Sequence, residues 1–177
     1  MTLLESLIID LRRLHDALDR SLDGLSSDQL HMVPAGHARA NTIAWNVWHY
    51  TRTEDNVVRF ALQNRRPTVW GEGGYPDRLG LHPAAQGTGM PTEEAQALRI
   101  KDVPLFGAYM KAVWASTEAY VQALTPAELD RKIALKFVGE MPLVRVLASV
   151  GVTHGFTHLG EIELARTLVG AGPVTGG

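Results

Sequence analysis

The sequence predicts an all-α protein, a four-helix bundle with a long loop between its second and third helices. Four long segments carry apolar residues at helical spacing, and no segment alternates convincingly as a half-buried strand does. Amphipathic helices bury their apolar stripes against one another, which is the architecture of a bundle. The length of 177 residues suits one domain, 1–177, that is large enough to bury a core.

The first helix is expected from about Leu3 to Leu22, where Gly24 ends it. Its apolar stripe consists of Leu3, Leu4, Leu7, Ile8, Leu11, Leu14 and Leu18. His15 lies at the edge of this stripe, either as a core-boundary residue, the favoured interpretation, or as a rival metal ligand. A short helix at 26–32 and a loop at 34–41 follow, and His37 in this loop is expected to be exposed.

The second helix begins at a cap provided by Asn41 or Thr42 and extends to about Gln63. His49 can turn inward, and Glu54 lies among apolar residues, so we expect it to be buried with a hydrogen-bonding or cationic partner. The expected polar, solvated stripe of this helix is Arg52, Asp55, Arg59 and Gln63.

Residues 65–91 are rich in glycine and proline and show no helical or strand periodicity. Loops of this length in compact domains are mostly functional covers or linkers. Trp70, Tyr75, Leu79 and Leu81 indicate that this one packs onto the bundle, and His82 within it is a weak candidate ligand.

The remaining segments complete the bundle. After a short helix at 92–99, Asp102 can cap a third long helix that ends near Leu124. Thr125, Pro126 and Glu128 mark the start of another short helix. Residues 131–141 form a connector in which KIALKF is a candidate for brief extended chain. The last helix runs from Pro142 to about Val169.

The last helix contains the pattern THGFTHLGE, which places His154 and His158 four residues apart on one face. The same face carries Leu143, Leu147, Val150, Ala165 and Leu168. Glu161 shares this face, and three ionisable groups in an apolar stripe are costly unless they satisfy one another or bind a cation. The spacing therefore indicates a metal site. Because bundles build such sites from facing helices, His49 is the natural third ligand.

Other classes of site lose support. Gly155 stands where a zinc peptidase of the HExxH type has its general-base glutamate, so that chemistry is missing. The chain has no cysteine, a net charge of −2 and no basic stripe, which excludes thiolate ligands and argues against a nucleic-acid partner. No apolar run reaches the roughly 18 residues of a membrane span, and the N-terminus does not resemble a signal peptide. The cytoplasm is the expected location.

Two motifs resemble the DinB-like superfamily of four-helix-bundle metalloproteins. NTIAWNVWHYTRTED, residues 41–55, is similar to the second-helix segment that carries one ligand histidine, and HGFTHLGEI, residues 154–162, is similar to the HxxxHxG[QE]I pattern of the fourth helix. The resemblance implies that His49, His154 and His158 bind a divalent ion, commonly zinc or nickel, with water completing the shell, and that the chain forms a homodimer. Position 161 is often Gln in the family and is Glu161 here.

Family members with an assigned activity are metal-dependent thiol transferases or isomerases, so the resemblance implies a low-molecular-weight thiol and an electrophile as substrates. Two alternatives stay open, a stress-associated metal or small-ligand binding protein without turnover and a metal-dependent hydrolase. Glu161 is either a proton acceptor in catalysis or a carboxylate that orients a histidine. Arg52 and Arg59 either hold carboxylates of the thiol or belong to the solvated stripe.

An apolar side of the last helix supports the expected homodimer independently of the resemblance. Val152, Phe156 and Leu159 lie opposite its histidine face, and so much apolar surface is unusual in water. Cover by the glycine-rich loop is the alternative.

Overall fold

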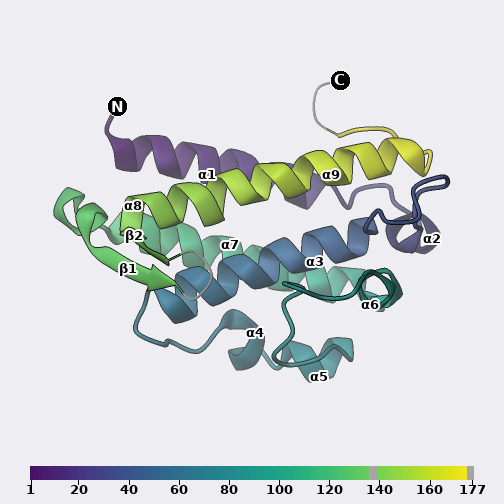
Figure 1. The fold of residues 1–177 in the computed structure, drawn as a ribbon, viewed down its shortest axis with the longest axis horizontal. Helices are drawn as coiled ribbons and strands as arrows, with labels where there is room; N and C mark the ends of the chain where they lie inside the picture. Colours follow the sequence, from purple (N-terminus) through teal and green to yellow (C-terminus); the bar gives the residue numbers. More distant parts are fainter. Residues whose placement is uncertain (136–138, 175–177) are drawn as a thin grey trace.

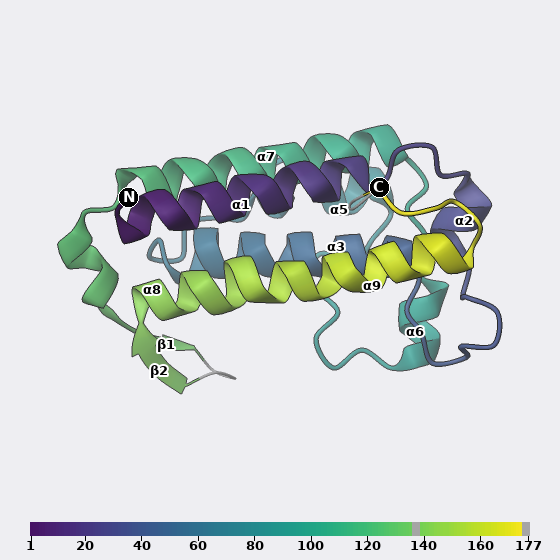
Figure 2. The ribbon, with the colours of Figure 1, turned by 90° about the horizontal axis from the view of Figure 1, so that it is seen from above.

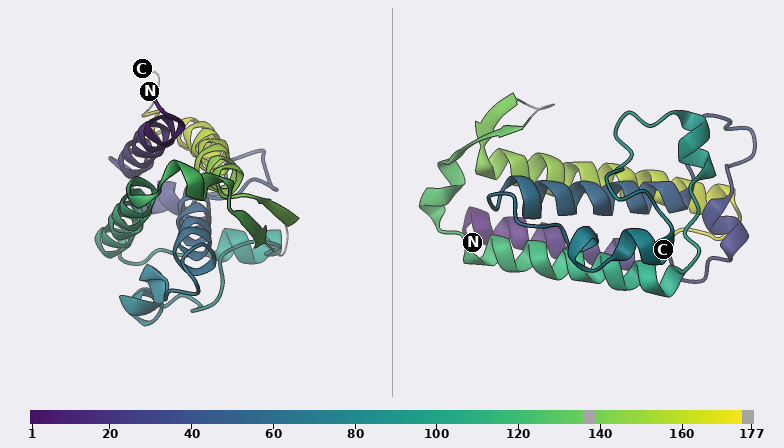
Figure 3. Two further views of the ribbon diagram at one scale, coloured as in Figure 1. Left: turned by 90° about the vertical axis from the view of Figure 1, so that its left-hand side faces the viewer. Right: turned by 90° about the horizontal axis from the view of Figure 1, so that it is seen from below.

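The computed structural model describes residues 1–135 and 139–174 and confirms the all-α class (Figure 1). Four long helical rods lie at the corners of the bundle when it is viewed end on (Figure 3). The rods are α1 (Leu3–Arg20), α3 (Ile43–Glu54) continued by the π-helical segment η1 (Asp55–Ala61), α7 (Val103–Ala123), and α8 (Leu143–Val146), which leads through the π-helical segment η3 (Leu147–Thr153) into α9 (His154–Leu168). The predicted caps Thr42 and Asp102 accept hydrogen bonds from the amides of Trp45 and Leu105.

The direction of the rods explains the long connection between the second and third of them. Rods α1 and α9 run one way, whereas α3 and α7 both run the other way (Figure 2). The most extensive contacts between rods join α3 to α9 and α1 to α7, and further contacts join α1 to α9 and α3 to α7. Because α3 and α7 are parallel, the chain must return along the bundle, and a helix of 21 residues spans about 31 Å. A short turn cannot cover that distance.

The connection contains more helix than the sequence predicts. It forms α4 (Val69–Glu72), α5 (Tyr75–Leu79) and α6 (Thr92–Ala97), of which only α6 lies within a predicted helix. The expectation of a segment without helix over 65–91 is therefore wrong, because helices of four and five residues are too short to show a 3.6-residue period. Trp70 and Leu79 are buried and Tyr75 and Leu81 pack against the same core, as predicted.

The stripe that was expected to be solvated lies beneath this connection. Arg52, Asp55 and Arg59 are 2%, 1% and 9% exposed. The Asp55 carboxylate accepts hydrogen bonds from the amides of Val69 and Trp70, both at 2.9 Å, and so caps the start of α4. The Arg52 guanidinium lies 4.8 Å from the centre of the Trp70 ring. The stripe is polar because it anchors the connection, and the prediction of a solvent-facing side is wrong.

The smaller elements are α2 (Ser27–His31), the 3₁₀ helix η2 (Pro126–Asp130) and a hairpin of β1 (Lys132–Leu135) and β2 (Gly139–Pro142). The strands are antiparallel and pair Ile133 with Met141. This hairpin contains the predicted extended run, whose residues 136–137 lie outside the described part of the chain. In that part, no helix combines the length and the apolar character that crossing a membrane requires.

Two predictions about the burial of apolar residues in the last rod are wrong. Leu168, placed on the core face, is 41% exposed because it lies at the end of α9. Leu159, expected on an uncovered face, is 6% exposed and packs in the core cluster with Leu14 and Leu18 of α1. Val152 and Phe156 are partly buried. The covering element is α1 and not the glycine-rich loop.

Candidate metal centre

Three histidines from two helices meet inside the bundle. His49 comes from α3, and His154 and His158 come from α9, which packs alongside α3. One ring nitrogen of each lies within 4.8 Å of one ring nitrogen of the others. The ring centres are 4.5 to 5.3 Å apart and each pair of rings is nearly perpendicular. The group that the sequence predicts is thus brought together, and it could hold a metal ion.

Gly155 allows this close approach of the two helices. A β-carbon at this position would lie 2.2 Å from Leu14 and 2.7 Å from the ring of Tyr50. A side chain at the residue after His154 would therefore force Leu14 and Tyr50 to shift. Packing at this position therefore disfavours the glutamate that the HExxH pattern has after its first histidine.

The connection between α3 and α7 fixes the orientation of His49. The Nδ1 atom of His49 donates to the backbone carbonyl of Gln86, and its ring stacks on Trp45 with centres 4.6 Å apart. Gly87 has φ +92° and lies so close that a β-carbon would be 2.7 Å from His49 Nδ1. With its proton on Nδ1, His49 presents the lone pair of Nε2 to the other two rings.

His158 is oriented in the same manner from the opposite side. Its Nδ1 atom lies 2.9 Å from Glu161 Oε2 and 3.1 Å from Asn46 Oδ1, both of which accept a hydrogen bond. The proton is therefore on Nδ1, and the lone pair of Nε2 points toward His154. A carboxylate behind a ligating imidazole is the usual arrangement at metal sites.

The arrangement of His154 fits a cation. Its Nε2 atom lies 3.0 Å from Nε2 of His158, and its Nδ1 atom is buried without a hydrogen-bond partner in the described residues. With its proton on Nε2, His154 donates a hydrogen bond to His158; with its proton on Nδ1, two lone pairs face each other and a cation between them would relieve their repulsion. Two nitrogens bound to one zinc ion at ~2.0–2.1 Å in tetrahedral geometry are about 3.3 Å apart. The observed spacing is close to that value.

The surroundings of His154 and His49 lower the pKa of each imidazole and so favour the neutral form that binds a metal. Burial, reinforced by the neighbouring His158 and His49, lowers the pKa of His154 to about 4. Burial likewise lowers the pKa of His49. Both imidazoles are therefore neutral at pH 7 and do not need to lose a proton before binding a cation. The hydrogen bond with His158 lowers the pKa of Glu161, which is a carboxylate under the same conditions.

Glu161 lies behind His158 and not among the three ring nitrogens. It was expected to approach the ion or its bound water, with an orienting role for a histidine as the alternative. The contact with His158 Nδ1 is the geometry of that alternative. Its side chain is half exposed, so it also remains accessible from outside.

The other candidate histidines, His15, His37 and His82, lie outside the three-histidine group. For His15 and His37 this agrees with the interpretations that the sequence favoured. His15 is buried between Glu54 and Glu118, with ring nitrogens 3.3 and 2.9 Å from their carboxylates. His37 and His82 are exposed. Glu54 is fully buried and also accepts a hydrogen bond from Tyr50, so its predicted partners are present.

Three contributors to the site escaped the sequence analysis. Asn46 could have been found, because it precedes His49 by three residues and so lies on nearly the same helical face. Gln86 contributes only its backbone carbonyl, a group that every residue has, so its residue type gave no indication of the contact. Gly87 was indistinguishable from the other glycines of the connection.

The fold and the site together define a helical-bundle protein with a three-histidine group on two facing helices. A sequence model of the DinB superfamily matches residues 10–162, and the chain belongs to this superfamily. The chain is also similar to a solved structure described as the conserved protein of locus from Enterococcus faecalis, with a TM-score of 0.80 and 19% identity over 96% of this chain and 98% of that chain. At this identity the similarity concerns the fold alone. No curated protein matches the chain.

Proposed function

We propose that the protein is a cytoplasmic divalent-metal-dependent enzyme that activates a low-molecular-weight thiol for attack on an electrophile. The observation that carries this proposal is the convergence of three imidazoles, His49, His154 and His158, in a chain without cysteine. Imidazole ligands suit zinc and nickel, which are the ions we propose. A cytoplasmic location would suit this function, because small thiols are kept reduced there.

The three histidines leave coordination positions free for an outside ligand. A bound divalent cation would supply the charge that deprotonates a thiol, which creates the attacking thiolate. The chain's own residues prepare this step: Gln86, Asn46 and Glu161 fix the tautomers of His49 and His158. No cysteine of the chain competes with the substrate for the site.

Glu161 has two proposed roles. Its contact with His158 supports the role of orienting that imidazole, and the alternative is that its half-exposed carboxylate accepts the thiol proton. Glu161→Gln preserves the size of the side chain but not the basicity. Retained metal with at least a tenfold lower rate supports proton acceptance, since general bases contribute about 10²–10⁴-fold. Full activity with retained metal removes that role and leaves the orienting one.

Arg52 and Arg59 are not available to bind the thiol substrate that the resemblance implied. Both of these guanidinium groups are buried: Arg52 donates to the carbonyl of Ala85 and Arg59 pairs with Glu72. They hold the connection in place, so neither the substrate-binding role nor the solvated role is supported. The recognition of the thiol must lie with other residues.

The test begins with elemental analysis of the purified protein, for which we expect one zinc or nickel per chain. The loaded protein is then incubated with glutathione, bacillithiol or mycothiol and with chlorodinitrobenzene or an epoxide. Conjugation faster than in the metal-depleted His158→Ala variant supports the transferase. Equal rates for every thiol would contradict it and leave a metal-binding protein, while thiol-independent ester cleavage would favour a hydrolase.

A further inference from the structure

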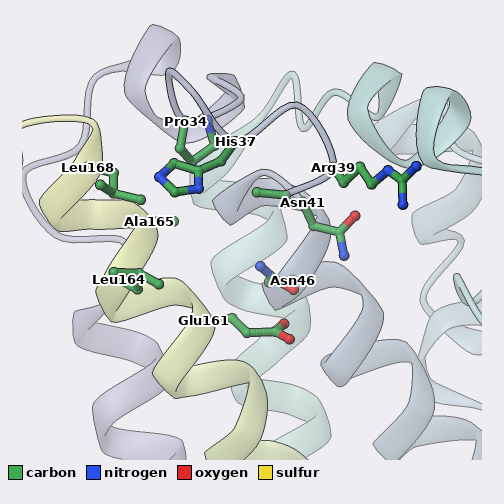
Figure 4. Close-up of a pocket in the computed structure, with 10 residues that line it drawn as sticks. Pro34, His37, Arg39, Asn41, Asn46, Glu161, Leu164, Ala165 and Leu168 are labelled. Carbon is green, nitrogen blue, oxygen red and sulfur yellow. The ribbon is translucent and has the colours of Figure 1, made fainter.

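A pocket of about 210 Å³ opens beside the metal centre, between the 34–41 loop and the C-terminal half of α9 (Figure 4). Glu161 and Asn46 lie together at one end of it, and His37 and Leu168 lie at the other end. The pocket is smaller than the sites of drug-sized ligands, which measure about 300–1,000 Å³. Its occupant must therefore be a small molecule.

The pocket adjoins the metal centre directly. Glu161 and Asn46 are the two side chains that contact Nδ1 of His158, the nitrogen that faces away from His154. A ligand on these two residues therefore lies one imidazole ring away from the three converging nitrogens. This is the position expected for the part of a substrate that does not react.

The side chains of the pocket differ in kind from one end to the other. The Glu161 carboxylate is half exposed and can accept N–H donors from a ligand. Leu164 and Leu168 are 61% and 41% exposed, which makes an apolar wall. Arg39 is exposed at the rim, where its side chain points away from Glu161 (Figure 4), and it has no hydrogen bond or ion pair with any described residue, so its guanidinium can swing toward a ligand.

We propose that this pocket binds a short peptide-like zwitterion, with its ammonium group on Glu161, an apolar side chain on Leu164 and Leu168, and its carboxylate on Arg39. The opposite charges of the ligand match the negative floor and the positive rim, and charge-assisted hydrogen bonds to ammonium and carboxylate are stronger than neutral ones. The inference rests on the proposed function, for which it names the substrate class: a thiol built on an unblocked peptide.

The test compares three probes that differ by one charge: alanyl-leucine, its N-acetyl derivative and its C-terminal amide. Binding is measured by calorimetry and by amide chemical shifts, on metal-free and zinc-loaded protein. We expect the free dipeptide to bind and to shift the signals of residues 161–168. Acetylation should weaken binding at least about tenfold, and the amide should weaken it severalfold, because each removes a charged partner.

Matched variants locate the site. Leu164→Ser and Arg39→Ala should weaken the free dipeptide, and Arg39→Ala should remove the difference between the dipeptide and its amide. Ile9→Ser, an equally exposed apolar position on α1, should leave binding unchanged. Equal binding of the three probes, shifts elsewhere or no binding at millimolar concentration would overturn the proposal.

The outcome is separable from that of the proposed function because the readout is binding. Selective dipeptide binding in a protein without conjugating activity keeps the pocket and discards the transferase. Conjugation of thiols that is indifferent to Leu164→Ser and Arg39→Ala keeps the transferase and discards the pocket.

Discussion

At the scale of single residues, Gly155 sets how closely the metal-centre helices approach. It lies where α9 crosses the side chains of Leu14 and Tyr50, and any β-carbon would collide with both. Tyr50 in turn contacts the ring of His154, with centres 5.8 Å apart. A larger residue at this position would displace α9 and with it two of the three histidines.

We predict that Gly155→Ala lowers the free energy of unfolding by about 1–3 kcal/mol, the usual cost of overpacking a core. Urea denaturation measures the change. Gly160→Ala is the matched control in the same helix, because a β-carbon there meets nothing within 4 Å. The control should raise stability by roughly 0.5–1 kcal/mol, since glycine is unfavourable in a helix. Equal stabilisation by both substitutions would contradict the packing argument.

His15 and Glu54 form a buried pair whose protonation contributes to stability. Burial opposes the charge on His15, but Glu54 and Glu118 outweigh it and raise the pKa of His15. Burial also opposes the charge on Glu54, but His15 and hydrogen bonds outweigh it and lower the pKa of Glu54. The stabilisation that His15 contributes is fully present below its pKa in the unfolded chain and is lost as pH rises through its raised pKa in the folded protein. The stabilisation that Glu54 contributes is fully present above its pKa in the unfolded chain and is lost as pH falls through its lowered pKa in the folded protein.

We predict that the metal-free protein loses stability as pH rises from the unfolded His pKa of about 6.5, because the unfolded chain then binds fewer protons than the folded one. His15→Gln should flatten this slope, whatever it does to the overall stability. Urea denaturation between neutral and mildly alkaline pH measures both slopes. A wild-type slope that the substitution leaves intact would show that His15 is not the group responsible.

The three histidines of the candidate site could be predicted from the sequence, because helix geometry relates residue spacing to a common face. The spacing of His154 and His158 fixes their common face, and His49 followed from the way bundles face their helices. The burial of Arg52 and Asp55 was beyond the sequence, because it depends on a distant segment that lies over them. A polar stripe looks the same whether it contacts water or the backbone of another segment.

At the scale of elements, the connection from α3 to α7 is part of the candidate site. It contacts the rod of α3 and η1 at successive positions: Arg52 donates to the carbonyl of Ala85, and Asn56 donates to the side chain of Gln86 at 2.5 Å. The backbone carbonyl of Gln86 in turn accepts a hydrogen bond from His49 Nδ1. The position of one metal-centre histidine therefore depends on a segment that the sequence predicts only as a loop.

We predict that Gly87→Ala weakens zinc binding by about 10–100-fold, the usual cost of disturbing a partner of a metal ligand. A β-carbon at this position would press on His49 Nδ1 and on Trp45. Gly89→Ala is the matched control: it has a positive φ of 73° but nothing within 4 Å of its β-carbon, so it carries the backbone strain without the collision. Competition with a chelating dye gives the affinities. Equal losses in both variants would assign the effect to strain alone.

Long elements were predictable, and short ones were predictable where local residues indicated them, as in α2, α6, η2 and β1. The caps Thr42 and Asp102 and the stripes of the rods set their boundaries to within a few residues. The helices α4 and α5, which were not predicted, have four and five residues, too few for a 3.6-residue period to emerge. What fixes α4 is a tertiary contact, since the carboxylate of Asp55 in η1 accepts hydrogen bonds from its first two amides.

At the scale of the whole molecule, the directions of the rods decide which residues meet. The sequence predicts four helices but not that α3 and α7 run parallel, because that depends on the path of the connection. This path places α3 beside α9 and so brings His49 to His154 and His158. The bundle class was derivable from amphipathic periodicity, whereas the neighbour relations were available only from the structure.

The predicted homodimer also belongs to this scale, and the structure restricts where its interface can lie. Leu159 is covered by α1, so it cannot contribute much contact. Ile9 is 54% exposed, and Arg13, one helical turn further on, lies over the ring of Phe156 with 5.9 Å to its centre. Val152 lies one turn before Phe156 on the other helix. These residues form a mixed apolar surface along the side that α1 and α9 share, as Figure 1 shows for the two rods.

We predict that the protein is a homodimer that pairs through this surface, because a two-fold interface uses the same patch of both copies and apolar side chains there lose contact with water. Sedimentation over a wide concentration range should give twice the mass of the chain. The double substitution Ile9→Asp with Phe156→Asp should give the monomer, because it places like charges opposite each other. Phe60→Asp, at a 46% exposed position on η1, is the control and should keep the dimer. A monomer at every concentration would refute the dimer, and a dimer that survives the double substitution would place its interface elsewhere.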